Sequence, residues 1–363
     1  MTRRAYWCFF IVLPSRRERR RPACRRAFRL VTATAVAALL GACGTGTKPP
    51  PPPPSGQGSA GPCSASVRDP TCQVLWGISA GPASISSLER SIGRRFDLVY
   101  FFDAIDSADL PDAAERKVVA SGQTLHINLE SREFGKAGHP VVPWSSVAAG
   151  EFDATLRQAA RGLAELRKPF FVTFDHEADA PAKVNSRGTA AQFVAAWRHV
   201  RQVFLDAGAT QAIWTWVVTG FRANFAAAQA LYPGNDAVDW ISWDPYDARG
   251  CQTGSVGSSP PQTFAEVAKP FYDWLATTGA QAGISLQKPY MISETGSAFD
   301  PSRPAATAAY YRSIPAGLRE LPRIRAVTIW DQAVGTCDYR VDGVQQLRPA
   351  LRAAADQLLH ASG

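Results

Sequence analysis

From residue 73 onwards the sequence contains no glycine-rich G-x-G-x-x-G turn, and the whole chain has no C-x-x-C pair. The first absence argues against a doubly wound sheet that binds a dinucleotide, because that fold places the turn after its first strand. The second argues against a structural zinc site. No apolar run is long enough to cross a bilayer either, since a spanning helix needs about 20 residues.

Net charge is also nearly absent once the first 43 residues are set aside. Residues 1–43 hold ten arginines and one glutamate, and the remainder carries 29 basic and 30 acidic residues. The formal charge of +8 therefore belongs to the amino terminus. A nucleic-acid partner is not expected for the rest of the chain.

A positive segment followed by a short apolar one marks the amino terminus as an export signal. Three arginines precede the apolar stretch 30–40, and small residues lead to Cys43. The tetrapeptide LGAC that ends there resembles a bacterial lipobox, which implies cleavage before Cys43 and a lipid on its sulfur. A plain secretory signal with an incidental cysteine is the alternative. We expect an exported lipoprotein at a membrane or cell surface, with residues 1–43 as its signal peptide.

Residues 44–62 contain six consecutive prolines among glycine and serine. This composition cannot bury a core and favours extended polyproline II, so it predicts a spacer. A ligand for an SH3-type domain is the competing interpretation. Residues 63–363 show no internal repeat and no second domain, and they are predicted to form one globular domain that is a monomer.

Four cysteines remain beyond the signal peptide. An even number in an oxidising compartment suggests two disulfides, with three possible connectivities. We favour a close pair that clips the start of the domain and a second pair that joins two late loops: Cys63–Cys72 and Cys251–Cys337.

Short apolar, aromatic and β-branched runs alternate with longer segments along the domain. Their continuous apolarity suits strands that are buried on both faces of a parallel sheet. The eight predicted strands are 73–79, 96–102, 124–130, 169–177, 212–218, 238–244, 288–294 and 326–332.

Helical periodicity fills the intervals between these strands. Phe193, Trp197, Val200 and Phe204 recur at helical spacing on one face of a segment that opens near Thr189. Eight strands, each followed by a real or plausible helix, predict a (β/α)8 TIM barrel, with a doubly wound open sheet as the alternative. Other helical segments are predicted at 84–93, 152–166, 262–276, 304–319 and 345–359.

Two predicted strands end on glutamates. The stretch 169–181, PFFVTFDHEADAP, delivers Glu177, and 288–296, KPYMISETG, delivers Glu294. They would end the fourth and seventh strands, which face each other across the mouth of an eight-stranded barrel. Glycoside hydrolysis uses such a pair, one as proton donor and one as nucleophile. Either glutamate alone could instead cap a helix or pair with an arginine.

Two short motifs suggest other enzymes but lack their partners. GISAG at 77–81 fits a serine esterase elbow, yet only the leader and spacer precede it, and only His360 follows Asp331 as a catalytic histidine. HEADA at 176–180 lacks the second histidine of a zinc protease. We expect no metal and no organic cofactor.

Four segments carry a resemblance to glycoside hydrolase family 26, a retaining family of β-mannanase-like enzymes. The similarity spans roughly 73–359 and implies a TIM barrel that cleaves a β-linked polysaccharide. The segments are FDHEA (174–178), ALYPGNDAVDWISWDPYD (230–247), KPYMISETG (288–296) and IRAVTIWDQ (324–332).

The resemblance implies that Glu177 is the acid/base and Glu294 the nucleophile. Tyr246 would hydrogen-bond the nucleophile, and Trp330 would form an aromatic floor under the sugar. The substrate-binding residues implied in this way are His126, His176, Trp216, Tyr246 and Trp330.

The chain departs from the family directly after the acid/base. Typical members carry a glycine and a tryptophan there, whereas 178–181 reads Ala-Asp-Ala-Pro. The predicted substrate is β-1,4-mannan, followed by mixed-linkage β-glucan, β-1,3-xylan or a cell-envelope polymer. A non-catalytic glycan-binding lipoprotein on the same barrel is the alternative from another class.

Overall fold

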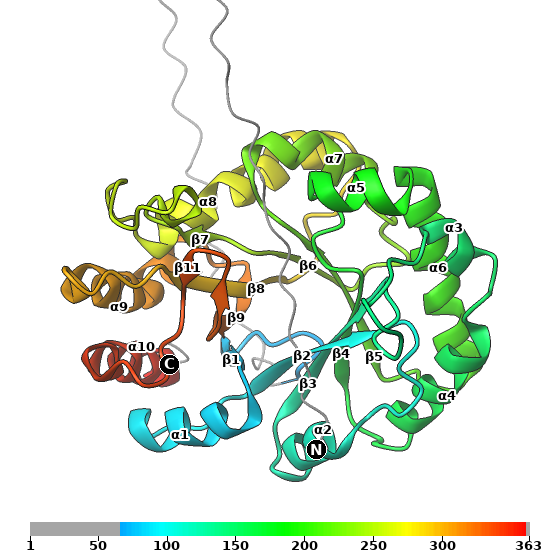
Figure 1. The fold of residues 1–363 in the computed structure, drawn as a ribbon, viewed down its shortest axis with the longest axis horizontal. Helices are drawn as coiled ribbons and strands as arrows, with labels where there is room; N and C mark the ends of the chain where they lie inside the picture. The colour runs from blue at the N-terminus through cyan, green and yellow to red at the C-terminus, as the bar shows by residue number, and fades with distance from the viewer. Residues whose placement is uncertain (1–65, 361–363) are drawn as a thin grey trace, which may run out of the picture. The chain divides into compact units, whose positions relative to one another are not determined.

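Eight parallel strands close into a barrel in the computed structural model, which describes residues 66–360 (Figure 1). Neighbouring strands pair in chain order, β9 pairs with β1, and β6 pairs with β8, so the ring has no open edge. The predicted TIM barrel is confirmed, and each predicted strand segment overlaps an observed one. The barrel strands are β1 (Leu75–Ser79), β2 (Leu98–Ala104), β3 (Thr124–Glu130), β4 (Phe170–Phe174), β5 (Ala212–Val218), β6 (Trp240–Trp243), β8 (Tyr290–Ser297) and β9 (Ile324–Trp330).

Helices surround the barrel, and Figure 1 shows the first helix of the ring beside the last. The predicted start near Thr189 is a capping box, because its side chain accepts from the Gln192 amide and the Gln192 side chain accepts from the Thr189 amide. The helices are α1 (Pro82–Ile92), α2 (Ala113–Ala120), α3 (Trp144–Ala148), α4 (Asp153–Ala164), α5 (Pro181–Arg187), α6 (Ala190–Asp206), α7 (Phe225–Ala230), α8 (Phe264–Trp274), α9 (Pro304–Glu320) and α10 (Arg348–His360).

Apolar side chains fill the amino-terminal end of the barrel. The segment before β1 closes this end, where the Trp240 indole donates to the Arg68 carbonyl at 2.9 Å. A larger core lies between the strands and the helices. Polar chemistry is therefore confined to the other end, where the strands point. The buried side chains of the closed end are Leu75, Leu98, Phe171, Ile213, Trp240, Met291 and Ala326.

Three short strands and a disulfide lie at the carboxyl end of the barrel. β7 (Tyr246–Asp247) pairs with β8, and β10 (Ala333–Val334) forms a hairpin with β11 (Cys337–Asp338). Cys251 and Cys337 are joined by a disulfide, as predicted. This bond ties the segment after β7 to the hairpin that follows β9.

The amino-terminal predictions lie outside the described residues. They are the signal peptide 1–43 with Cys43, the spacer 44–62, and Cys63. Cys72 is disulfide-bonded, and its predicted partner Cys63 belongs to the part of the chain that is not described. No helix within residues 66–360 is long and apolar enough to cross a membrane.

Candidate active site

The two predicted glutamates come from strand ends that meet at the carboxyl mouth of the barrel. Glu177 follows the end of β4 and is partly exposed, and Glu294 lies in β8 with 5% of its surface exposed. The two carboxyl groups are close enough for the charge of Glu177 to raise the pKa of Glu294. The fold thus brings together acidic residues that are 117 positions apart in the sequence.

The chain makes an unusual turn as it leaves β4. Asp175 and Glu177 both have left-handed backbone conformations, with φ of 52° and 50°. Such values in residues other than glycine are uncommon and cost free energy, so the surroundings must hold them in place. The Asp175 amide donates to the Leu129 carbonyl and the Glu177 amide to the Val217 carbonyl, each at 3.0 Å. The turn is therefore fastened to β3 on one side and β5 on the other.

Glu294 is held through its side chain. The Tyr246 hydroxyl donates to Glu294 Oε2 at 2.7 Å. The register between β8 and β9 shifts between Ile292 and Thr295, so Glu294 lies at a local irregularity of the strand. Irregularities of this kind re-aim side chains and are frequent beside active sites.

Several aromatic rings lie near these carboxyl groups. Trp330 lies at the end of β9, 2% exposed, with its ring centroid 5.6 Å from that of Phe102 in an edge-to-face contact. Phe102 also meets the His176 ring edge-on, at 4.9 Å. The Tyr246 ring packs against Tyr339, which lies two residues after the disulfide-bonded Cys337.

Both carboxyl groups hold their protons more tightly than free glutamate. Burial raises the pKa of Glu177 to about 7, against an opposing effect of the Lys183 charge. Burial and the charge of Glu177 raise the pKa of Glu294 to about 8, although the Tyr246 hydrogen bond lowers it. Because each charge disfavours the other, the pair carries a proton near neutral pH.

His176, between the two unusual backbone positions, is a neutral imidazole. Burial and the Lys183 charge lower its pKa to about 4. Its Nδ1 lies 2.9 Å from Glu130 Oε1. Burial raises the pKa of Glu130, but the charges of Lys183 and Arg187 outweigh burial and hold that pKa well below its usual value. The Asn128 amide nitrogen also lies 2.9 Å from Nδ1. Nε2 lies 3.8 Å from Glu294 Oε1.

Two of the predicted sugar-binding residues lie away from the mouth. His126 is fully buried inside the barrel, where its ring stacks on Tyr100 at 3.9 Å and its Nε2 meets Thr173 Oγ1 at 2.8 Å. Trp216 is fully buried on the helix side of β5, against Tyr232. A sugar at the mouth cannot touch either side chain without rearrangement.

The alternative motif around Ser79 has a structural explanation. Ser79 is the last residue of β1, 1% exposed, and its hydroxyl donates to the Tyr100 carbonyl at 3.2 Å. It therefore lies within a barrel strand and not on an exposed turn between a strand and a helix, which a serine nucleophile requires.

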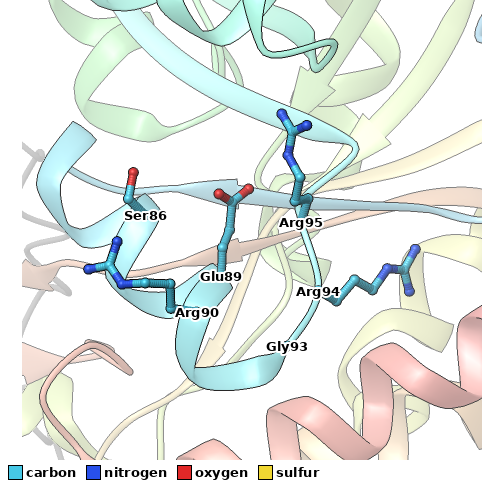
Figure 2. A pocket seen from close by; sticks show the side chains of 6 residues that line it. All are labelled: Ser86, Glu89, Arg90, Gly93, Arg94 and Arg95. Atoms are coloured by element: carbon cyan, nitrogen blue, oxygen red, sulfur yellow. The ribbon is translucent and has the colours of Figure 1, made fainter.

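One hollow lies away from the two glutamates, at the carboxyl end of α1. It measures about 350 Å³. Figure 2 shows its arginines pointing in different directions, and Arg94 is already engaged with Asp97 at 3.0 Å. Within residues 66–360 no group of His, Cys, Asp and Glu is arranged to hold a metal ion. The hollow is lined by Ser86, Glu89, Arg90, Gly93, Arg94 and Arg95.

Sequence reasoning missed a buried ion cluster beside Glu177. Lys183 and Arg187 of α5 are each 1% exposed and face Glu130 and Asp175. One signal was present, since Glu130 ends a predicted strand just as Glu294 does. The two cations, four residues apart directly after an acidic strand end, were a second signal, because that spacing places both on one face of a helix.

Solved structures of other proteins share this fold. No family model matches the chain. The catalytic domain of a family 26 endo-β-1,4-mannanase from Bacillus sp. JAMB-750 superposes with a TM-score of 0.56 at 15% identity, covering 80% of this chain and 89% of that one. A family 26 β-mannanase from Bacteroides ovatus gives 0.56 at 14%, covering 78% and 89%. The resemblance to this family is therefore present in the fold.

A modular endo-β-1,4-mannanase from Cellulomonas fimi also matches, with a TM-score of 0.55 and 16% identity over 78% of this chain and 70% of that one. Among curated proteins, endoglucanase H of Acetivibrio thermocellus is 26% identical over 235 residues, or 61% of this chain. The match spans only 23% of that longer protein. At these identities the likeness establishes the architecture, and the chemistry has to be argued from the site.

Proposed function

We propose that this chain is a retaining glycoside hydrolase that cleaves a β-linked polysaccharide. The observation that carries the proposal is the meeting of Glu177 and Glu294 at the barrel mouth, with Tyr246 bonded to Glu294. Hydrolysis with retention uses two carboxyl groups on opposite sides of the glycosidic bond, one as acid/base and one as nucleophile. The family 26 mannanases that share the fold and the matched endoglucanase support the same class of activity.

Hydrogen bonding decides which glutamate holds the shared proton. The Tyr246 hydroxyl donates to Glu294, which favours the carboxylate form, whereas no residue within 66–360 donates to the Glu177 carboxyl. Burial and the charge of Glu177 raise the pKa of Glu294, and the Tyr246 hydrogen bond opposes them. We give more weight to the hydrogen bond, because it acts on one carboxyl while burial acts on both. Glu177 is then the acid and Glu294 the nucleophile.

The reaction proceeds by double displacement. Glu294 attacks the anomeric carbon while the Glu177 carboxyl gives its proton to the leaving glycosidic oxygen, so the bond to the leaving sugar breaks. A covalent bond between the sugar and Glu294 results, and Glu177 is left ionised. Glu177 then takes a proton from water, whose oxygen displaces Glu294 and restores the original configuration.

β-1,4-Mannan is the substrate we favour, since mannanases share the fold. Mixed-linkage β-glucan comes next, in view of the matched endoglucanase, and β-1,3-xylan and cell-envelope polymers follow. Trp330 would lie beneath the sugar ring, and His176 Nε2 would contact a sugar hydroxyl. Both residues would contact the sugar whose bond is cleaved.

Export and a lipid anchor on Cys43 complete the proposal. The disulfide between Cys251 and Cys337 supports an oxidising compartment. The polysaccharide would be met at the cell surface or in the space outside the cytoplasm, by a monomer that needs no cofactor.

A panel of β-1,4-mannan, mixed-linkage β-glucan and β-1,3-xylan tests the proposal, with released reducing ends as the measurement. We expect the full chain to hydrolyse at least one of them. Glu294→Ala should lower kcat/KM by about 10⁶-fold, as removal of other catalytic nucleophiles does. Lys269→Met is the control, because it removes an exposed ion pair with Asp273 and should change nothing.

A non-catalytic glycan-binding protein is the second candidate, favoured by the segment 178–181 that departs from the family. Affinity electrophoresis in the same polysaccharides separates the two. If wild type and Glu294→Ala both bind a glycan and neither releases reducing ends, the binding protein is the better description. Release by wild type that Glu294→Ala abolishes rules it out.

A further inference from the structure

Helix α5 carries two buried cations directly behind the turn that presents Glu177. Lys183 and Arg187 are one helical turn apart on a helix of seven residues, and each is 1% exposed. Burying a charge is costly unless partners surround it. Two acidic residues meet these cations, Glu130 at the end of β3 and Asp175 at the end of β4.

Arg187 belongs to the framework of this cluster. Its Nη2 lies 3.0 Å from Glu130 Oε2, and its Nη1 contacts Asp175. The Trp144 indole completes the environment by donating to Asp175 Oδ2 at 2.7 Å. All of these contacts join side chains, so they hold the helix against the strands without touching the backbone of the turn.

Lys183 reaches the turn itself. Its ammonium donates to the backbone carbonyl of His176, and it also lies 3.3 Å from Glu130 Oε1 and 3.4 Å from Asp175 Oδ1. His176 lies between the two residues with left-handed backbone conformations, Asp175 and Glu177. The ammonium therefore fixes the peptide that joins His176 to Glu177.

Lys183 also opposes the effect of burial on Glu177. Its positive charge lowers the pKa of Glu177, which burial has raised to about 7. The ammonium comes from α5, whereas the acidic groups come from β3, the turn after β4, the end of β6, and β8. The acidic groups that interact with Glu177 are Glu130, Asp179, Asp244 and Glu294.

We propose that Lys183 is a positioning residue for Glu177, acting through the His176 carbonyl and not on the substrate. The inference rests on the proposed function, in which Glu177 is the acid/base. Lys183 is too deeply buried to meet a sugar. Its removal should therefore affect the proton-transfer role of Glu177 and leave the nucleophile and the sugar floor in place.

The positioning role can be tested by comparing the activity of Lys183→Met on two substrates. One is the natural glycan, whose leaving sugar needs a proton. The other is the 2,4-dinitrophenyl β-glycoside of the same sugar, whose leaving group needs none. We expect kcat/KM for the glycan to fall about 10- to 100-fold, the loss expected for a misplaced catalytic group. The kcat/KM of the aryl glycoside reports only the first displacement, which needs no proton donor, and should stay near the wild-type value. Equal losses of kcat/KM on both substrates would overturn the proposal.

The double variant Lys183→Met with Glu130→Gln separates position from charge and guards against misfolding. It removes one cation and one anion together, so the buried cluster keeps its charge balance, and glutamine keeps the size of the side chain that it replaces. The loss on the natural glycan should persist, because the donor to the His176 carbonyl is still missing. Recovery to wild-type activity would contradict the positioning role.

A titration that needs no turnover distinguishes this inference from the proposed function. Carboxyl ¹³C-NMR of glutamate-labelled protein, assigned with Glu177→Gln, reports the pKa of Glu177 directly. We expect that pKa to rise in Lys183→Met and to return towards wild type in the double variant. If the wild type hydrolyses no glycan, the proposed function fails, and an unchanged Glu177 pKa in Lys183→Met would separately refute the placement of Lys183. Lys269→Met is the matched control throughout.

Discussion

Two pairs of neighbouring carboxyl groups, each with at least one raised pKa, occupy very different parts of this barrel. One is Glu177 with Glu294 at the mouth. The other is Asp103 of β2 with Glu115 of α2, both buried, where burial and Asp103 raise the pKa of Glu115 to about 9. Glu115 hydrogen-bonds to Asp103, and its Oε2 accepts from the Asp112 amide at 2.6 Å in a capping box.

The contrast shows that a raised pKa does not by itself mark an active site. The strand that carries Asp103 also carries Phe102, and successive side chains on a strand point to opposite faces. Phe102 faces the barrel mouth, where it meets His176, and Asp103 faces the helix layer. Asp103 and Glu115, the outer pair, are buried, and Glu115 also belongs to a helix cap. Glu177, by contrast, is partly exposed beside aromatic rings. A substrate can reach the pair at the mouth but not the buried pair.

The largest effect on the mouth pair, after loss of the nucleophile, should come from Glu177→Ala. We expect kcat/KM on the natural glycan to fall about 10²- to 10⁴-fold, the usual contribution of a general acid. Azide should restore turnover of the dinitrophenyl glycoside and yield a β-glycosyl azide, because azide attacks the covalent intermediate without a general base. Chromatography of the products checks this, and an absence of the azide adduct would assign Glu177 another role.

Tyr246→Phe should have a smaller effect on the same pair. The hydroxyl donates to Glu294 and lowers its pKa, so its removal should raise the pKa of Glu294 and shift the acidic limb of the pH–rate profile to higher pH. A hydrogen bond to a charged group is worth about 1.5–3 kcal/mol, which predicts a loss of roughly 10- to 150-fold in kcat/KM. A profile that keeps its acidic limb would show that Tyr246 acts only in packing.

The smallest effect on activity is expected at the outer pair. Glu115→Gln keeps the shape and a donor for Asp103, and kcat/KM should match wild type. Stability should respond, since the folded-state pKa of Glu115 is raised to about 9 from 4.5. At intermediate pH the folded protein then binds more protons than the unfolded protein. The contribution of Glu115 to the free energy of unfolding is therefore complete below the unfolded pKa and is lost as the pH rises towards 9.

Denaturant unfolding between pH 5 and 9 measures this contribution. Wild type should lose up to about 1.4 kcal/mol of unfolding free energy per pH unit from this group, and Glu115→Gln should show a shallower decline. Identical slopes would mean that the outer pair titrates normally. A loss of activity in this variant would break the contrast between the two pairs.

The local signals in the sequence were sufficient for the barrel. Apolar runs such as 124–130 and 212–218 coincide with β3 and β5, because continuous apolarity and β-branching act within each segment. The glutamates at the strand ends were predictable for the same reason. Parallel strands end at the same side of a sheet, so Glu177 and Glu294 could be expected to meet.

Side-chain direction and long-range pairing were not predictable in this way. Trp216 and Trp330 both lie near strand ends, yet one faces Tyr232 in the helix layer and the other faces the mouth. A shift of one residue along a strand moves a side chain to the other face. No helix was predicted at Lys183, and the packing of α5 against β3 and β4 buries that side chain.

The sequence by itself determined the eight-stranded ring and the two acidic strand ends, since hydrophobic periodicity and strand chemistry are properties of short segments. Tertiary structure alone decided which side chains reach the mouth, how the turn at His176 is held, and which cations lie beneath it. Those features arise where segments that are distant in the chain pack against one another and exclude water. The sequence of one segment does not specify which other segments it will contact.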